Sequence, residues 1–260
     1  MTANRVTIVS GFLSNANNRD FHKSGEYLRN GKLLLKSTTP KIIFLDEEMF
    51  SQIQETDYNP ENTQLIVCNK TQAYYMKYVD NINTLPITDN PTKDTKEFLL
   101  TIWNKTEYMR EAVKLNSFDT DYYVWVDFGI RYVCKESSDQ EFTKKLDNLV
   151  QPDLGLHTKV RIGGIWNPNC IYHYDLINQI AWYFAGGVFG GNKEALLWFS
   201  EEMRSAGEEL VMTHHTATWE VNLWYLIYKK FPDMFDIYPS SHNETLIDGY
   251  GSSEPVTSFI

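Results

Sequence analysis

Short apolar runs that end in a polar residue or a glycine recur along the chain. Such runs predict strands that are buried on both faces of a sheet. The predicted strands are Val6–Phe12, Lys41–Leu45, Gln64–Cys68, Tyr122–Val126 and Trp182–Phe189. Apolar residues at helical spacing predict helices between them. These are His22–Ser37, one long helix after a loop within Pro91–Asp119, Lys135–Val150, Lys193–Ala206 and His215–Lys230.

The order of these elements predicts the fold. Strands and helices alternate as far as Asp127, which favours a parallel sheet with helical crossovers, and the pattern is more mixed afterwards. We expect an α/β fold in a single domain, residues 1–260, with a mixed sheet flanked by helices. A Rossmann-like half (1–130) and a second half (131–260) would share that sheet, with the cleft between them.

The remaining segments predict loops and helix ends. Leu13–Asp20 is rich in Asn and predicts a loop. Thr92 or Asp94 is the expected cap of the long helix. His157–Gly164 and Trp166–Tyr174 predict strand and loop, and the last 20 residues or so predict a polar tail.

Charge and cysteine content exclude several classes of protein. The net charge of −10 argues against a nucleic-acid groove, which needs a basic stripe. The three cysteines have no zinc-site spacing, so buried free thiols are expected. No apolar run reaches the length of a membrane span, and no signal-peptide pattern opens the chain, so a cytoplasmic location is expected.

The first functional motif is Asp121-Tyr-Tyr-Val-Trp-Val-Asp127-Phe-Gly129. Asp127 follows a buried strand directly, and open α/β sheets bind ligands at the carboxyl ends of their strands. A carboxylate there suits a divalent metal ion held against a phosphate. Asp127 is the candidate metal ligand, although a strand-end Asp is also a common turn or cap residue.

Two further motifs lie in the second half of the chain. Phe184-Ala-Gly-Gly-Val-Phe-Gly-Gly191 lacks the spacing of a dinucleotide fingerprint, but Gly186 and Gly187 would let backbone pass close to a ligand. A plain tight hairpin is the alternative. Glu220 follows Trp219 near the start of a predicted helix, where it would take a proton from an acceptor hydroxyl or simply stabilise the helix.

Isolated residues complete the candidate site. His242 is the best candidate for a second metal ligand, and Lys105 and Arg131 are the candidates for binding a pyrophosphate. Each of them also fits an ordinary surface position. His214 and His215 lack zinc-pair spacing and are expected to be loop or cap residues.

Taken together, these segments resemble a known family. Residues 115–130 resemble the central motif of the bacterial HtrL/YibB-type proteins, in which a helix with a Lys leads to a Trp-hydrophobic-Asp-x-Gly strand. Phe184–Gly191 is similar to the Gly-Gly-x-hydrophobic-Gly-Gly block of that family. The resemblance implies a GT-A fold and sugar transfer. GT-A enzymes usually carry a second Asp two residues after the first, where this chain has Gly129.

The resemblance implies a function and roles for the candidate residues. The chain is expected to be a glycosyltransferase that moves a sugar from a nucleoside diphosphate sugar, with UDP as the expected nucleotide, to a glycan hydroxyl. Inversion is favoured; with retention, Glu220 would instead face the other side of the anomeric carbon as a nucleophile or electrostatic stabiliser. The first half would bind the nucleotide and the second half the acceptor. Asp127 would bind Mn²⁺ or Mg²⁺, and Glu220 would act as the general base. The nucleoside pocket would be lined by Ser10, Gly11, Phe12 and Asp46.

Two alternatives from other classes remain open at this point. One is a non-catalytic glycan- or nucleotide-binding protein on the same fold, which the missing second Asp permits. The other is a glycoside hydrolase that uses Asp127 and Glu220 as a carboxylate pair without any nucleotide.

Overall fold

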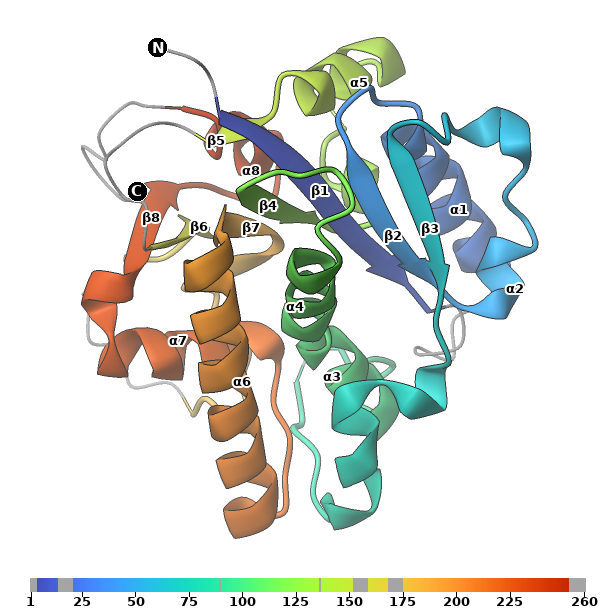
Figure 1. Cartoon of the computed structure of the whole chain (residues 1–260). Helices are drawn as coiled ribbons and strands as arrows, with labels where there is room; N and C mark the ends of the chain where they lie inside the picture. Colours follow the sequence, from blue (N-terminus) through green and yellow to red (C-terminus); the bar gives the residue numbers. More distant parts are fainter. Residues whose placement is uncertain are drawn as a thin grey trace.

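A mixed β-sheet with helices on both faces forms the centre of the protein (Figure 1). The computed structural model describes residues 4–13, 21–88, 90–135, 137–151, 159–167 and 175–252. Seven strands follow the order β3-β2-β1-β4-β7-β6-β8, and β5 pairs with the start of β1. The strands are β1 (Asn4–Phe12), β2 (Lys41–Leu45), β3 (Thr63–Val67), β4 (Tyr122–Val126), β5 (Val150–Gln151), β6 (Val160–Gly164), β7 (Phe184–Asn192) and β8 (Phe235–Pro239).

The pairing of the strands brings distant segments to one edge of the sheet. β3, β2, β1 and β4 are parallel neighbours, so their carboxyl ends lie at the same edge. β7 runs antiparallel to β4, with Val188 opposite Val126. The first residues of β7 therefore lie beside the residue that follows β4, and the backbone N–H of Asp127 donates to the carbonyl of Gly187 at 2.9 Å.

The helices form two layers. One face of the sheet packs on α3, α4, α6 and α7 through the larger core cluster, and the other face packs on α1, α5 and α8 through the smaller one (Figure 1). The helices are α1 (Phe21–Leu35), α2 (Glu47–Phe50), α3 (Lys96–Trp103), α4 (Lys105–Leu115), α5 (Asp139–Asp147), α6 (Lys193–His214), α7 (Glu220–Lys230) and α8 (Thr245–Asp248).

The predicted fold class is confirmed. The sheet is mixed, its first half is parallel, and helices cover both faces, as the alternation of elements indicated. The predicted strands are confirmed with small shifts at their ends, and β7 begins and ends later than expected. The strands β5 and β8 were not predicted. Residues 14–20, 152–158 and 168–174, which include parts of three predicted segments, lie outside the described residues.

The long helix predicted before β4 is two helices. Thr95, rather than Thr92 or Asp94, caps α3 by accepting a hydrogen bond from the N–H of Phe98. Asn104 then separates α3 from α4, with ψ at −6° and its side-chain amide donating to the carbonyl of Leu100 at 2.7 Å. Side chains of this type compete with the backbone for hydrogen bonds, so they favour helix ends.

The last predicted helices also have different ends. α6 continues to His214, and His215 closes it in the left-handed conformation with φ at 52°. His215 is thus a cap residue, as expected. α7 begins at Glu220 rather than His215, because Thr216 pairs with Thr84 in an isolated parallel bridge that keeps the chain extended. Lys135–Val150 contains the shorter helix α5 (Asp139–Asp147).

Residues 241–252 are more structured than the predicted polar tail, and 253–260 lie outside the described residues. Tyr250 is fully buried, and α8 packs on the same face of the sheet as α1 and α5. Arg161 on β6 holds this region, because its guanidinium donates to the carbonyls of Gly249, Tyr250 and Ser252 and pairs with Asp236.

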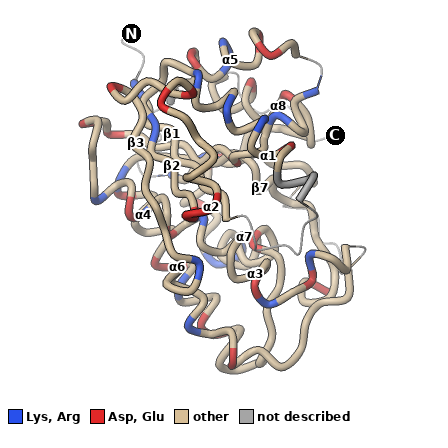
Figure 2. Tube along the Cα trace, turned by 90° about the vertical axis from the view of Figure 1, so that its right-hand side faces the viewer, with Lys and Arg blue, Asp and Glu red and all other residues tan. Residues whose placement is uncertain are grey.

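Charges of both signs are interspersed along the helices. Figure 2 shows Lys and Arg positions next to Asp and Glu positions on α5 and α6. Among the helices that the structure describes, none combines the length and the hydropathy that a membrane crossing requires.

Candidate active site

A cavity of about 260 Å³ opens at the carboxyl ends of β1 and β4. It is walled by the ends of these strands, the start of β7, the first turns of α4 and α7, and the loop before α8. Eight of the predicted site residues line it: Gly11, Phe12, Lys105, Asp127, Gly186, Gly187, Glu220 and His242. The structure therefore brings together residues that are far apart in the sequence, and their roles toward a ligand stay predictions.

The ammonium of Lys105 joins the two candidate carboxylates. Its Nζ lies 3.0 Å from Oδ1 of Asp127 and 2.9 Å from Oε1 of Glu220, and it donates to the carbonyl of Gly186 at 2.9 Å. The side chain of Lys105 is 11% exposed, that of Glu220 6% and that of Asp127 38%. Asp127 is thus the member of this cluster that solvent or a ligand reaches.

The surroundings of Lys105 keep it charged. Burial lowers the pKa of its ammonium, but the nearby carboxylates of Asp127 and Glu220 raise it, and the balance lies above the usual lysine value. One ammonium and two carboxylates leave one negative charge uncompensated. Lys105 was predicted to bind a pyrophosphate, but all three of its bonds go to protein groups, so its main contact in this structure is with the carboxylates.

Asp127 is oriented by its neighbours. Nε1 of Trp125 donates to Oδ1 of Asp127 at 2.7 Å, on the same oxygen that is closest to Lys105. The carbonyl of Asp127 accepts the N–H of Ile130 at 2.9 Å and so starts the turn after β4. Oδ1 accepts two short contacts, whereas Oδ2 has a single long contact of 3.4 Å with Lys105. Oδ2 is therefore the oxygen with more capacity for a ligand.

Glu220 is the first residue of α7, and one of its oxygens is unpaired. Trp219, the residue before it, has extended dihedral angles and starts the helix. Oε1 accepts from Lys105, whereas Oε2 is buried and has no hydrogen-bond partner among the described residues. A buried carboxylate oxygen without a partner is unfavourable, so a ligand hydroxyl that donates to it would be stabilised.

The backbone must pass close to this cluster at Gly186. A Cβ at that position would lie 2.5 Å from Oε1 of Glu220 and 3.3 Å from Nζ of Lys105. At Gly187 a Cβ would lie 2.8 Å from Cδ1 of Ile130. The glycine at 186 thus makes room for the ion pair, which is a more specific reason for a glycine than the hairpin alone.

His242 lies at the rim of the cavity against Trp182. The two ring centroids are 4.6 Å apart and the rings are perpendicular. Burial lowers the pKa of the His242 imidazole, which favours the neutral form at neutral pH. Neutral imidazole is the form that binds metal ions.

The donor set fits a divalent ion only together with a phosphate ligand. Among the described residues, no three His, Cys, Asp or Glu side chains form a ready-made metal cluster. Mg²⁺ is commonly held by one or two carboxylates plus substrate phosphates, and Asp127 offers one partly exposed carboxylate. The uncompensated negative charge of the cluster also favours a cation. Asp127 would hold such an ion, with His242 as the second candidate ligand.

Ser10 and Asp46 lie outside the cavity lining. Ser10 is fully buried in β1 and does not line the cavity, whereas Gly11 and Phe12 at the end of the strand do. Asp46 caps α2 by accepting a hydrogen bond from the N–H of Met49 at 2.8 Å. A nucleoside pocket that includes Ser10 and Asp46 stays a prediction.

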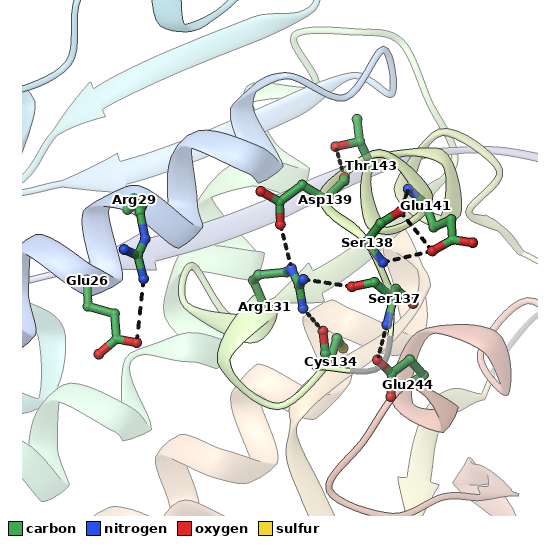
Figure 3. A network of polar contacts seen from close by, with 10 residues as sticks. All are labelled: Glu26, Arg29, Arg131, Cys134, Ser137, Ser138, Asp139, Glu141, Thr143 and Glu244. Atoms are coloured by element: carbon green, nitrogen blue, oxygen red, sulfur yellow. Dashed lines mark hydrogen bonds and ion pairs between the residues drawn. The ribbon is translucent and has the colours of Figure 1, made fainter.

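Arg131 also lies outside the cavity lining and holds a loop instead. Its guanidinium bonds to Asp139 at 3.1 Å, to the carbonyl of Ser137 at 2.7 Å and to the carbonyl of Cys134 (Figure 3). The carboxylate of Glu244 accepts the N–H of Ser137 at 3.0 Å. This network connects the turn after β4 to the segment that carries His242, so Arg131 stabilises the loops next to the cavity without lining it.

Aromatic side chains that the sequence did not mark as functional line much of the cavity. They are Tyr27, Phe98, Tyr108, Trp125, Phe128, Tyr132, Trp182 and Trp219. The only signal in the sequence was the high content of Tyr and Trp, because a buried core ring and a ring that lines a cavity look alike in a sequence.

Comparisons with known proteins place the chain in a family. A family model described as "Bacterial protein of unknown function (HtrL_YibB)" matches residues 6–245. Among solved structures, mouse xyloside xylosyltransferase 1 in its apo form is similar with a TM-score of 0.46 and 10% sequence identity, over 90% of this chain and 84% of that one. A comparison with curated protein sequences found no match.

Proposed function

The chain belongs to the HtrL/YibB family of bacterial proteins, and we propose that it is a GT-A-type glycosyltransferase that uses a nucleoside diphosphate sugar. The observation that carries the proposal is the pair Asp127 and Glu220 in one cavity, joined by Lys105, at the edge where open α/β sheets bind ligands. The carboxylate at the end of β4 is partly exposed, and the one on α7 is buried.

The two carboxylates have different roles in this proposal. Asp127 receives the diphosphate side of the donor, with a UDP-sugar as the first donor to test. When bound there, Mn²⁺ or Mg²⁺ would supply positive charge that offsets the negative charge developing on the leaving diphosphate. The sugar would lie in the cavity against the backbone of Gly187, whereas the room at Gly186 is taken by the pair of Lys105 and Glu220.

Glu220 acts on the acceptor. The acceptor hydroxyl donates its proton to Oε2 of Glu220, and its oxygen forms a bond to the anomeric carbon of the donor sugar. The bond from that carbon to the diphosphate oxygen breaks, and the nucleoside diphosphate leaves with the electron pair. Attack from the side opposite the leaving group inverts the configuration. Lys105 fixes Oε1 and thereby leaves Oε2 for this role.

The same geometry argues against a hydrolase with a carboxylate pair. Such an enzyme needs one of the two carboxyls protonated as a general acid. Here Asp127 and Glu220 each accept a hydrogen bond from the same charged Lys105. A shared ammonium suits a pair in which neither carboxyl is a proton donor: Asp127 binds a cation and Glu220 accepts a proton.

A binding screen tests the proposed donor class. The melting temperature of the protein is measured against a panel of nucleoside diphosphate sugars, with Mn²⁺ and with a chelator. We expect at least one UDP-sugar to raise it, and more so with Mn²⁺, because a ligand that binds only the folded state stabilises that state.

Titration calorimetry then assigns the site. Asp127→Asn is expected to remove the Mn²⁺-dependent part of nucleoside diphosphate binding, whereas Asp121→Asn, at the opposite end of β4 and exposed, should leave it intact. A screen with no stabilising nucleotide, or an Asp127→Asn variant that binds as the wild type does, contradicts the proposal.

A further inference from the structure

One end of the cavity is built from aromatic rings that meet at right angles or steep tilts. The ring of Trp182 lies 6.2 Å from that of Trp219, at 64°, and 4.6 Å from that of His242, at 88°. Phe98 packs edge-on against Trp219 at 5.4 Å. Trp219 and Phe98 are buried, whereas Trp182 is only half-buried. Trp182 therefore offers ring surface at the cavity, and the other rings support it.

The backbone on both sides of Trp182 is fixed. The N–H of Trp166 donates to the carbonyl of Trp182 at 3.0 Å, which extends the pairing of β6 and β7 beyond the strands. One residue earlier, the N–H of Ala181 donates to Oδ1 of Asn222 at 2.9 Å, and Asn222 is fully buried on α7. The segment that carries Trp182 is thus anchored, through Ala181 and Asn222, to the helix that carries Glu220.

Trp219 is fixed as firmly. Its Nε1 donates to Oδ1 of Asp94 at 3.2 Å, and Asp94 also accepts the N–H of Thr88 at 2.8 Å. The ammonium of Lys93 lies 5.6 Å from the Trp219 ring. The rings and a few polar groups therefore form one rigid wall beside the catalytic carboxylate, because Trp219 and Glu220 are consecutive residues.

This combination suits one class of ligand. A pyranose ring has an apolar face of C–H groups and a rim of hydroxyls, so it needs a flat aromatic surface with hydrogen-bonding groups at the edge. Trp182 provides the surface, and Glu220, His242 and Lys93 line the cavity around it. Such sites are mostly apolar, with a few placed polar groups that fix orientation.

We propose that Trp182 is the platform of the acceptor subsite, on which a pyranose ring of the acceptor stacks with one hydroxyl directed to Glu220. That the bound sugar is the acceptor rests on the proposed function, whereas the sugar site itself is defined by the aromatic rings. Asp127 and Gly187 take the donor, and the Trp182 end of the cavity takes the second substrate.

The test measures sugar binding without any nucleotide. The probes are the methyl glycosides of glucose, galactose, mannose and N-acetylglucosamine, titrated at millimolar concentrations and followed by saturation-transfer NMR. We expect at least one of them to bind the wild type, and Trp182→Ala to weaken that binding by about tenfold or more. Trp182→Phe retains an aromatic face and should retain most of the affinity, which also guards against a variant that fails to fold.

Trp198→Phe is the matched control, because Trp198 is another half-buried tryptophan but packs on Phe231 and Phe235 outside the cavity lining. Its glycoside affinity should equal that of the wild type. The proposal is overturned if none of the four glycosides binds, or if a folded Trp182→Ala variant binds them as the wild type does. If the protein binds glycosides but consumes no nucleotide sugar, the proposed sugar site is supported and the proposed transferase activity is contradicted.

Discussion

Replacing Lys105 by methionine removes the ammonium that Asp127 and Glu220 share, while it keeps an unbranched side chain of similar length. The loss leaves the buried carboxylate of Glu220 without its charged partner. Removing one member of a buried ion pair costs about 3–5 kcal/mol. Asp127 is 38% exposed, so water screens its share and the contact with Glu220 dominates. We expect Lys105→Met to lower the free energy of unfolding by about 3 kcal/mol at pH 7.

The pH dependence of that effect follows from the pKa of Lys105. Burial lowers this pKa, but the two carboxylates raise it by more, so the folded-state value lies above the ordinary 10.5. A raised lysine pKa contributes stability that is fully present below the ordinary value and is lost only as the pH rises through the folded value. The difference between wild type and Lys105→Met should therefore be the same at pH 7 and pH 9.

Urea unfolding followed by circular dichroism measures both variants, and Lys114→Met on the same helix is the control. Lys114 pairs with Glu111 at 2.7 Å, but both side chains are about half exposed, so a loss of at most about 0.5 kcal/mol is expected. Adding Glu220→Gln to Lys105→Met should recover part of the loss, because it removes the orphaned charge. The reasoning is refuted if Lys105→Met is no less stable than Lys114→Met.

Three further predictions are tested by urea unfolding. Gly186→Ala should lose about 1–3 kcal/mol because its Cβ would lie 2.5 Å from Glu220, whereas Gly25→Ala on α1, with open space around it, should gain up to about 1 kcal/mol; equal effects would contradict the close approach. Burial lowers the pKa of Lys41 to about 8, so the unfolding free energy of the wild type minus that of Lys41→Met should rise between pH 8 and 10.5, where only the unfolded chain retains the Lys41 proton; a constant difference would contradict it. Asn222→Ala should cost at least about 3 kcal/mol because its amide bonds to the backbone of residues 176–181, and a smaller loss would mean that water replaces it.

The sequence was a good guide to the elements that bury whole runs of residues. The strand that ends at Asp127 is apolar throughout, and burial on both faces of a parallel sheet requires that pattern, so its position and the strand-end carboxylate were predictable. β8 (Phe235–Pro239) was missed because it is short, only Phe235 and Tyr238 of its residues are buried, and Asp236 interrupts its apolar run.

Contacts between distant segments were beyond the sequence. Lys105 meets Glu220 across 115 positions, and no local pattern records such a pairing. Arg131 looked as suitable for a phosphate as Lys105 did, but the loop before α5 supplies carbonyls that bind its guanidinium first. The break at Asn104 was equally hidden, although it makes Lys105 the first residue of α4 and so brings its ammonium to Asp127.

The central claim is that Glu220 accepts the proton of an acceptor hydroxyl while Asp127 holds the donor. The direct measurement is the rate of nucleoside diphosphate release from a UDP-sugar, with and without a glycan acceptor, in the wild type and in Glu220→Gln. A general base contributes about 10²–10⁴-fold, so the variant should lose turnover by that order. Its donor affinity, measured by calorimetry, should stay within about twofold of the wild type, because Glu220 does not hold the diphosphate. Undiminished turnover in Glu220→Gln, or no release from any nucleotide sugar by the wild type, contradicts the account.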